Sequence, residues 1–333
     1  MSYTNILAAA NNEKSPEQKL QEFLIPGLSR STVACIGGQD GQGKSYMTLV
    51  QLVAISCADP AADLMGLQPV HHGRVLMIEA EDDADTVNER VHAILKLIPK
   101  RCHDEIHSNL RIKILDGCDD GDGLGEQMTF DLLNDADALK IQQLAAGHLI
   151  VVLDTLSDFH NANGNDPSAM TEYMKVCEQI SKRNKQVVMN VHQVTKASVR
   201  ESESGSTVLV GAHAIAGKSS NIKLLFGLTS DEQKSLRCAD GSVIPPDDVG
   251  LYVRVQHSKF SRGGNKASFY LKRNVDGVLL PIVLIAGVAP ASRTGYRPKL
   301  AREAVSQPAV VENAKSAKKV RSTRAALFNR GTS

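Results

Sequence analysis

The stretch Gly38–Ser45, with the sequence GQDGQGKS, decides the fold of this chain. It matches G-x-x-x-x-G-K-[ST], the pattern of a phosphate-binding P-loop. An apolar run, Ser31–Ile36, comes just before it, and a stretch that can form a helix, Tyr46–Ala58, follows it. Because the motif has physical meaning only between a strand and a helix, these flanks favour a true nucleotide site over a chance glycine-rich turn.

Each part of this loop has a chemical role. Glycines let the backbone curl so that consecutive N–H groups point at phosphate oxygens, and the following helix N-terminus adds partial positive charge there. Lys44 would reach the β- and γ-phosphates, and the Ser45 hydroxyl would bind Mg²⁺. The residues expected to bind the nucleotide are Gly38, Gly41, Gly43, Lys44, Ser45 and Tyr46.

The composition excludes several classes of protein. The chain has 333 residues and a net charge of +1, so the whole chain shows no preference for a polyanion. Its six cysteines form no C-x-x-C pair, which argues against a zinc site or a disulfide framework. We expect no signal peptide and no membrane span, because no apolar stretch approaches 18 residues, and therefore a cytoplasmic protein without a membrane partner.

Short apolar runs alternate with helical patterns between about residues 22 and 290. Several runs are continuously apolar, as in strands that are buried on both faces. Strands are expected at 32–36, 74–78, 111–115, 149–153, 187–191, 222–228 and 251–256, and helices at 85–98 and 170–183. We therefore predict an α/β fold with a mostly parallel sheet flanked by helices.

The late strands differ from the earlier ones. Those at about 222–228, 251–256, 268–273 and 278–284 lack long helices between them. They predict an antiparallel meander at one edge of the sheet, with a hairpin turn at Asn274–Gly277.

The two ends of the chain differ in composition from the domain between them. Residues 1–21 predict a flexible N-terminal arm, and 22–290 a single nucleotide-binding domain. Residues 291–333 carry ten basic and two acidic side chains, a net +8, which predicts a disordered basic tail. The tail could bind nucleic acid, solubilise the protein or dock a partner, and its composition does not decide between these roles.

Polar residues end three of the apolar strands. Asp154 follows the run Leu149–Leu153, which is the Walker B pattern that holds water on Mg²⁺. Glu81 follows the strand at 74–78 and could polarise the attacking water, with Glu79 and Asp82 as rivals; helix capping is the alternative role.

The third strand end carries a histidine. His192 follows the run Val187–Val191 and could contact the γ-phosphate, reporting hydrolysis to the next loop. A single histidine at a strand end is more often structural, but this strand comes directly after the Walker B strand and a helix, and that order favours the functional role.

The order of these motifs resembles the RepA family of RecA-type hexameric replicative helicases of broad-host-range plasmids, and their AAA-family ATPase relatives. The resemblance rests on the P-loop, EAED at Glu79–Asp82, VVLDT at Val151–Thr155 and the His192 strand, and it covers roughly Phe23–Ile285. It implies a RecA-like ATPase core over 22–290, ring assembly, and hydrolysis of ATP with Mg²⁺ at subunit interfaces.

Individual roles follow from the same resemblance. Glu81 corresponds to the catalytic glutamate, Asp154 to the Walker B acid and His192 to the γ-phosphate sensor. Where RepA proteins often have a second histidine, this chain has Gln193.

Such rings also insert a basic finger from the neighbouring subunit, worth about 10³–10⁵ in rate in comparable NTPases. His213 stands where RepA has its finger arginine, with Lys218 nearby. Lys259 and Arg262 resemble the lysine–arginine finger pair of other RecA-like rings, with a spacing one residue wider. We count Lys259 and Arg262 among the expected catalytic residues and leave the finger open among all four.

The polar loop at 195–205 occupies the place of the channel loop in RecA-like rings. Lys196 and Arg200 would there contact the phosphates of single-stranded DNA. An ordinary solvated loop is the alternative, and Glu201 and Glu203 favour it.

The sequence therefore predicts an ATP-driven hexameric DNA motor, a RepA-like replicative helicase of a plasmid, phage or mobile element. A replication initiator or a primase is a candidate partner. The rival is a RecA-like ATPase that acts as a regulatory or recombination switch without unwinding. A kinase for a small substrate fits less well, because no stretch resembles an acceptor-binding lid.

Overall fold

The computed structural model describes Ser15 and residues 20–115, 129–163, 166–194, 212–260 and 268–287, all within one unit, Met1–Val288. It does not describe the side chains at 212, 213 and 260. The basic tail and nearly all of the N-terminal arm lie outside the described residues. The domain boundaries at 21/22 and 290/291 therefore stay predictions.

A nine-stranded sheet forms the centre of the described residues, in the order β12-β11-β10-β8-β3-β7-β6-β4-β5. Its strands are β3 (Thr32–Gly38), β4 (Val75–Glu79), β5 (Leu110–Ile114), β6 (Ile150–Asp154), β7 (Val187–Gln193), β8 (Ser219–Gly227), β10 (Tyr252–Phe260), β11 (Phe269–Arg273) and β12 (Leu279–Ile282). The continuously apolar runs β4 and β6 are buried along their whole length, as strands covered on both faces must be.

Six neighbouring strands, from β8 to β5, are parallel, and β10, β11 and β12 are antiparallel. This confirms the predicted mostly parallel α/β sheet with an antiparallel edge. The strand predicted at 222–228 does begin the meander, because β8 is antiparallel to β10. On its other side β8 is parallel to β3, and the short helix α9 (Ala212–Lys218) precedes it.

Two small sheets lie beside the large one. β1 (Phe23–Ile25) pairs with β2 (Leu28–Ser29) just before the P-loop strand. β9 (Leu236–Cys238) pairs with β13 (Leu284–Ala286). The strand expected at 278–284 is therefore divided between β12 and β13, which belong to different sheets.

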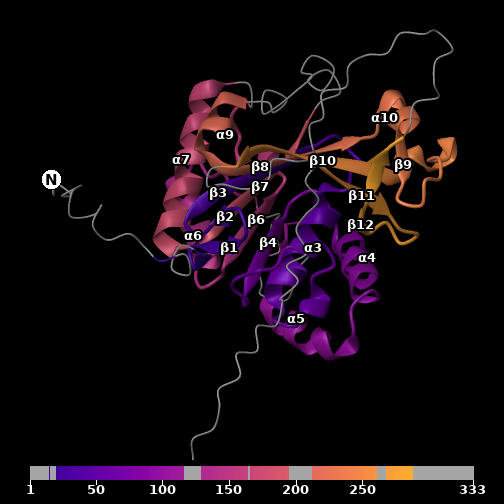
Figure 1. The fold of residues 1–333 in the computed structure, drawn as a ribbon. Helices are drawn as coiled ribbons and strands as arrows, with labels where there is room; N and C mark the ends of the chain where they lie inside the picture. Colours follow the sequence, from indigo (N-terminus) through magenta and orange to yellow (C-terminus); the bar gives the residue numbers. More distant parts are fainter. Residues whose placement is uncertain are drawn as a thin grey trace, which may run out of the picture. The chain divides into compact units, whose positions relative to one another are not determined.

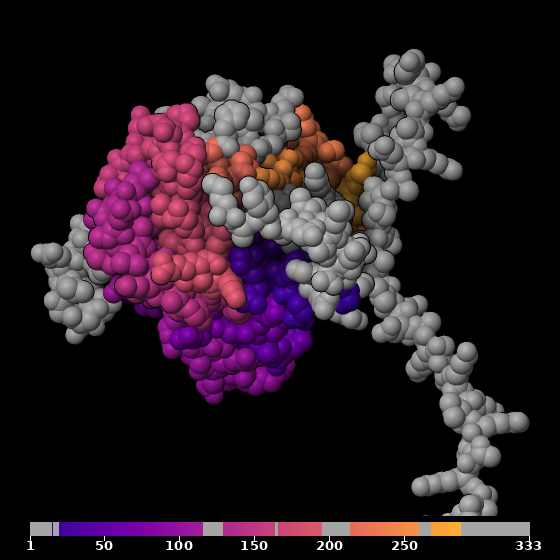
Figure 2. Space-filling model, turned by 90° about the vertical axis from the view of Figure 1, so that its left-hand side faces the viewer, coloured from indigo at the N-terminus to yellow at the C-terminus, as the bar shows by residue number. Residues whose placement is uncertain are grey.

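Helices cover both faces of the large sheet. The helices of the described residues are α3 (Lys44–Ser56), α4 (Ala84–Leu95), α5 (His103–Asn109), α6 (Asp135–Leu144), α7 (Pro167–Asn184), α9 and α10 (Ser230–Ser235), and the 3₁₀ turns are η1 (Pro60–Ala62), η2 (Lys100–Cys102), η3 (Leu156–Phe159) and η5 (Pro246–Leu251). Helices α3, α4 and α5 lie on one face, and α6, α7 and α9 on the other (Figure 1). The face formed by α6 and α7 is turned to the viewer in Figure 2.

Each face of the sheet has its own apolar core, because successive side chains along a strand point to opposite faces. Ile36 of β3 packs into the core beneath α3 and α4, with Leu52 and Ile94. Its neighbour Cys35 packs into the core beneath α6 and α7, with Tyr173. The parallel strands are therefore held between two apolar layers, which fixes their carboxyl ends as a rigid edge.

Side-chain caps define where several helices begin. Asp83 accepts a hydrogen bond from the Thr86 N–H (2.7 Å) at α4, and Asp166 accepts one from the Ser168 N–H (2.8 Å) at α7. Such caps satisfy amides that have no partner within the helix. In the part of the chain that the structure describes, no helix has the length and apolar character needed to cross a membrane.

Candidate functional site

The loop between β3 and α3 has the geometry of a phosphate-binding cradle. Gly41 and Gly43 adopt φ values of 71° and 85°, which favour glycine. A Cβ atom at Gly43 would lie 2.6 Å from Leu279 Cδ1, so the position has no room for a side chain. No side chain caps the amino end of α3, and no acid lies in its first turn. This helix end can therefore receive an anion.

The two polar side chains that open α3 are directed to different partners. Lys44 is almost completely buried, and its Nζ donates to the carbonyl of Gln39 (3.2 Å) and lies 3.8 Å from Asp40. The Ser45 hydroxyl donates to Asp154 Oδ2 (3.0 Å). The P-loop and the predicted Walker B strand are thus joined directly.

Asp154 ends β6, which is separated from the P-loop strand by β7. Its carboxyl group is buried, and burial raises its pKa to about 7. Its Oδ1 has no hydrogen-bond partner among the described residues. A buried carboxylate oxygen beside a hydroxyl fits Mg²⁺, a hard cation that takes oxygen ligands and keeps several waters. The described residues contain no cluster of three or more His, Cys, Asp or Glu that would hold a metal alone.

The three rival carboxyl groups after β4 have different surroundings. Glu79 is completely buried, and its Oε1 accepts from the Glu81 N–H (3.1 Å) and the Asp82 N–H (3.2 Å). Burial first, and then the charge of Asp154, raise the pKa of Glu79 to about 8. Asp82 forms an ion pair with Arg90 (2.5 Å).

Glu81 and Asp82 both line a hollow of about 230 Å³ at the P-loop, with Gly41, Gly43, Lys44, Ser45 and Tyr46. Glu81 is exposed there, whereas Asp82 is held by Arg90. Partial burial raises the pKa of Glu81, and the nearby Lys44 charge opposes that shift. Among the three carboxylates, the geometry favours Glu81 as the one able to reach a bound nucleotide.

His192 lies in β7, between the P-loop strand and the Asp154 strand. It is buried, and burial, with smaller contributions from Lys44 and His160, lowers its pKa to about 4. Its Nε2 has no hydrogen-bond partner among the described residues. The next residue, Gln193, donates to Asp40 of the P-loop, so the end of β7 contacts the loop directly.

Comparison with known proteins agrees with this geometry. A family model described as an AAA domain matches residues 5–199, which is more than half of the chain. The chain belongs to this AAA-domain family.

The AAA domain is also similar to solved structures of other proteins. A structure described as an ATPase domain matches with 11% identity and a TM-score of 0.54, covering 85% of this chain and 100% of that chain. A DnaB-like replicative helicase, described with its interactions with primase, matches with 15% identity and a TM-score of 0.50, covering 75% of this chain. This chain spans 57% of the length of that helicase. At these identities the likeness shows the fold alone, and it confirms the predicted RecA-like architecture.

The fold brings two further residues to the site, which the sequence did not predict. Arg273 and Arg90 line the same hollow as the P-loop. The Arg90 guanidinium lies 5.9 Å from the centre of the Tyr46 ring, and the Tyr46 hydroxyl donates to the Asp276 carbonyl (2.7 Å). Neither arginine belongs to a recognisable motif, and the only sequence signal was that Arg273 immediately precedes the predicted hairpin turn.

Of the four candidate finger residues, the structure describes the side chains of Lys259 and Lys218, and neither lines the hollow at the P-loop. Lys259 Nζ donates to the Ala216 carbonyl (2.5 Å) at the end of α9, and Lys218 forms an ion pair with Glu178 (2.8 Å). His213 lies in α9, but its side chain is outside the described residues. So are Arg262 and the predicted DNA-binding residues Lys196 and Arg200. Their roles stay predictions.

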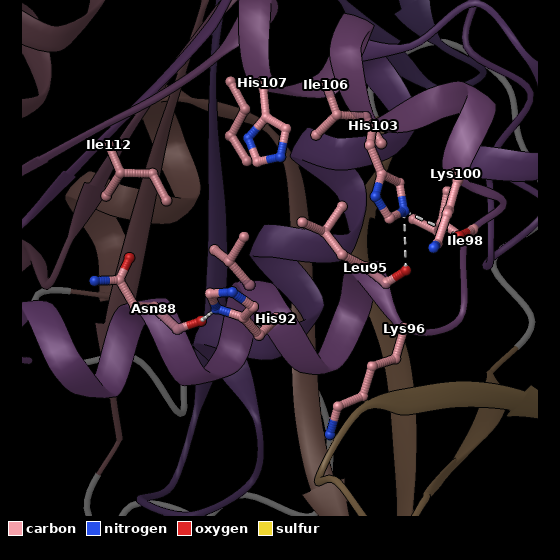
Figure 3. A pocket seen from close by; sticks show the side chains of 12 residues that line it. Asn88, His92, Leu95, Lys96, Ile98, Lys100, His103, Ile106, His107 and Ile112 are labelled. Atoms are coloured by element: carbon pink, nitrogen blue, oxygen red, sulfur yellow. Dashed lines mark hydrogen bonds between the residues drawn. The ribbon is translucent and has the colours of Figure 1, made fainter.

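A second, larger hollow of about 600 Å³ lies away from the phosphate loop (Figure 3). It is lined by α4, η2, α5 and β5, through Asn88, Val91, His92, Leu95, Lys96, Ile98, Lys100, His103, Ile106, His107, Leu110 and Ile112. His103 Nε2 is within hydrogen-bond distance of the Leu95 and Ile98 carbonyls, and His92 Nδ1 of the Asn88 carbonyl. One ring nitrogen of each of these two histidines is thus used to hold the backbone around the hollow.

Proposed function

We propose that this chain is an ATP-hydrolysing, ring-forming DNA motor, a RepA-like replicative helicase of a plasmid, phage or mobile element. One observation carries the proposal: the hydrogen bond from Ser45 of the P-loop to Asp154 at the end of β6, with Glu81 in the adjoining hollow. A phosphate cradle, a metal-binding carboxylate and a second, water-accessible carboxylate around one point are what ATP hydrolysis requires.

The roles of the residues follow from their surroundings. Lys44 would bind the terminal phosphates, and Ser45 with Asp154 would hold Mg²⁺, which neutralises phosphate charge when bound. Glu81 would orient and polarise the attacking water. His192, buried and uncharged at neutral pH, would respond to the γ-phosphate through its Nε2.

Ring assembly would complete the site from a neighbouring subunit. Lys259 pairs with Ile222 of β8, and Ile222 pairs with Cys35 of β3. Lys259 therefore lies at the height of Cys35 in the sheet, three residues before Gly38, where the P-loop begins. We infer that from this place it would serve a nucleotide on another subunit. We retain Lys259, Arg262, His213 and Lys218 as candidates for that role.

The DNA partner is proposed from the loop at 195–205. Lys196 and Arg200 would contact a single strand in the channel of the ring. Since a solved structure with a similar fold is described with its interactions with primase, we extend a primase-type partner to this chain as part of the proposal.

The test compares ATP turnover with and without single-stranded DNA, unwinding of a forked duplex, and the mass of the assembled particle. A motor gives stimulated turnover, directional unwinding and a particle of several subunits. Slow turnover with nucleotide-dependent assembly and no unwinding would instead support the regulatory switch. ADP that forms only with a particular acceptor would indicate a kinase.

A further inference from the structure

Arg273 is placed at the nucleotide hollow by the same chain that supplies the P-loop. It is the last residue of β11, and its Nη2 donates to the Gly41 carbonyl (2.6 Å). It lines the hollow with Lys44, Ser45 and Glu81. The Arg273 guanidinium also lies close to Gly43, since a Cβ atom added there would be 3.4 Å from Nη2.

The charge of Arg273 has no carboxylate partner among the described residues. Arg90, which lines the same hollow, is by contrast paired with Asp82. Burial lowers the pKa of Arg273, and the neighbour that raises it is Tyr46, not a carboxyl group. A guanidinium has five N–H donors, and the Gly41 carbonyl accepts from only one of its nitrogens. Leaving such a cation half-buried without an anion is unfavourable, so the arrangement is suited to a bound anion.

The hairpin between β11 and β12 holds Arg273 in this position. The Tyr46 hydroxyl donates to the Asp276 carbonyl (2.7 Å), and Lys96 forms an ion pair with the Asp276 carboxylate (3.1 Å). Figure 3 shows Lys96 extending from α4 toward this hairpin. Leu279, at the start of β12, packs against Gly43. The turn is thus fixed to both α3 and α4, which limits the movement of the guanidinium.

We propose that Arg273 binds the polyphosphate of the nucleotide held by its own chain, as a phosphate-binding residue supplied in cis. The inference rests on the proposed function and names a group additional to any finger from a neighbouring subunit. The planar guanidinium can donate two parallel hydrogen bonds to phosphate oxygens, and its charge would act beside that of Lys44. The β11–β12 hairpin would then be part of the nucleotide site.

The first test measures binding of tripolyphosphate, which has no base or ribose, by competition with a fluorescent ATP analogue in Mg²⁺. Arg273→Ala should weaken tripolyphosphate and ATP alike by at least about tenfold, since a hydrogen bond to a charged group is being removed. Arg273→Lys should recover part of the lost affinity, because lysine keeps the charge but cannot donate two parallel hydrogen bonds. Thermal unfolding of each variant separates a binding defect from a folding defect.

Lys272→Ala is the matched control. Lys272 is the adjacent cation in β11, but it pairs with Asp248 (3.3 Å) and lies over the Tyr252 ring, on the opposite side of the strand. Its removal should leave both affinities unchanged. If Arg273→Ala loses ATP but not tripolyphosphate, the arginine contacts the base or ribose and the assignment is overturned. Equal binding by Arg273→Ala and wild type also overturns it.

The second test decides between cis and trans. Arg273→Ala and Lys44→Ala proteins are mixed in equal amounts, and ATP turnover is measured. If Arg273 acts in cis, every site lacks one of the two cations and turnover stays as low as in either variant alone. Action in trans would restore about a quarter of the wild-type turnover, because that fraction of subunit interfaces would combine both intact residues. Failure of wild type itself to bind ATP would instead reject the proposed function.

Discussion

At the residue scale, three neighbouring carboxyl groups differ in how deeply they are buried and in what they contact. Glu79 is inside the protein beside Asp154, Asp82 is paired with Arg90, and Glu81 is exposed at the hollow. Glu79 and Asp82 are thus bound to groups of the protein, so Glu81 is our candidate for the contact with substrate and water.

Glu81→Gln should therefore reduce ATP turnover by about 10²–10⁴-fold while nucleotide affinity changes little, because the amide keeps the shape but cannot act as a base. Single-turnover hydrolysis and equilibrium binding measure the two quantities separately. Asp83→Asn is the control: it is a near neighbour that caps α4, and asparagine is an equally good cap. A variant Glu81→Gln with wild-type turnover would remove Glu81 from the mechanism.

The buried residue Lys223 should make the stability of the protein depend on pH. Its side chain is buried in β8, its Nζ donates to Gln51 (2.9 Å), and burial lowers its pKa to about 8 from 10.5. Between pH 8 and 10.5 the unfolded chain binds a proton that the folded chain does not. This group therefore contributes stability above pH 10.5 that is lost as pH falls toward 8, by about 3 kcal/mol in total.

Lys223→Met should make the free energy of unfolding less dependent on pH between 8 and 10, as measured by urea denaturation at several pH values. Lys175→Met, which removes an exposed lysine of α7, should keep the wild-type slope. Identical slopes for both variants would show that Lys223 ionises in the folded protein as it does in the unfolded chain.

The sequence predicts those site residues that belong to contiguous motifs. The P-loop, Asp154 and Glu81 each follow an apolar strand directly, so the parallel sheet brings them to one edge. Arg273 could not be predicted in this way, because it reaches the loop from β11, next to the edge strand β12 and some 230 residues later in the chain. Its position depends on how the hairpin packs on α3, which no local pattern encodes.

At the scale of elements, the β11–β12 hairpin should couple the stability of the edge to nucleotide binding. Gly277 has φ of 86°, and a Cβ atom there would lie 3.0 Å from ring and hydroxyl atoms of Tyr46. Gly277→Ala should both strain the turn and displace it from α3. We expect a loss of more than about 1 kcal/mol in the free energy of unfolding, and weaker nucleotide binding.

Gly241→Ala is the matched control for that experiment. Its φ is 83°, but nothing lies within 4 Å of an added Cβ atom, so it meets only the backbone strain. It should lower stability in denaturant titrations without changing nucleotide affinity. If Gly277→Ala and Gly241→Ala bound the nucleotide with equal affinity, the hairpin would not be part of the nucleotide site.

The strands of the sheet were predicted better than their pairing. Continuous apolar runs such as β4 and β6 were recognised because both of their faces are buried. The antiparallel run β8–β10–β11–β12 was predicted as well, because no long helix separates these strands. The pair β9–β13 was missed, because both strands are three residues long and only partly buried.

At the scale of the whole molecule, the loop at 195–205 should couple ATP turnover to DNA. Changing Lys196 and Arg200 together to alanine should reduce the stimulation of ATP turnover by single-stranded DNA, and its salt dependence, while basal turnover stays nearly unchanged. Turnover measured over a range of DNA concentrations tests this. Unchanged stimulation would show that the loop at 195–205 does not contact the strand.

The central claim is that Ser45, Asp154 and Glu81 surround a magnesium–triphosphate held by the P-loop. Steady-state hydrolysis of ATP by the purified wild-type protein, with Mg²⁺ or with EDTA and beside Lys44→Ala, tests it most directly. The account predicts turnover that needs Mg²⁺ and falls to background in Lys44→Ala. Wild-type protein that neither retains nor hydrolyses ATP in the presence of Mg²⁺ would contradict it.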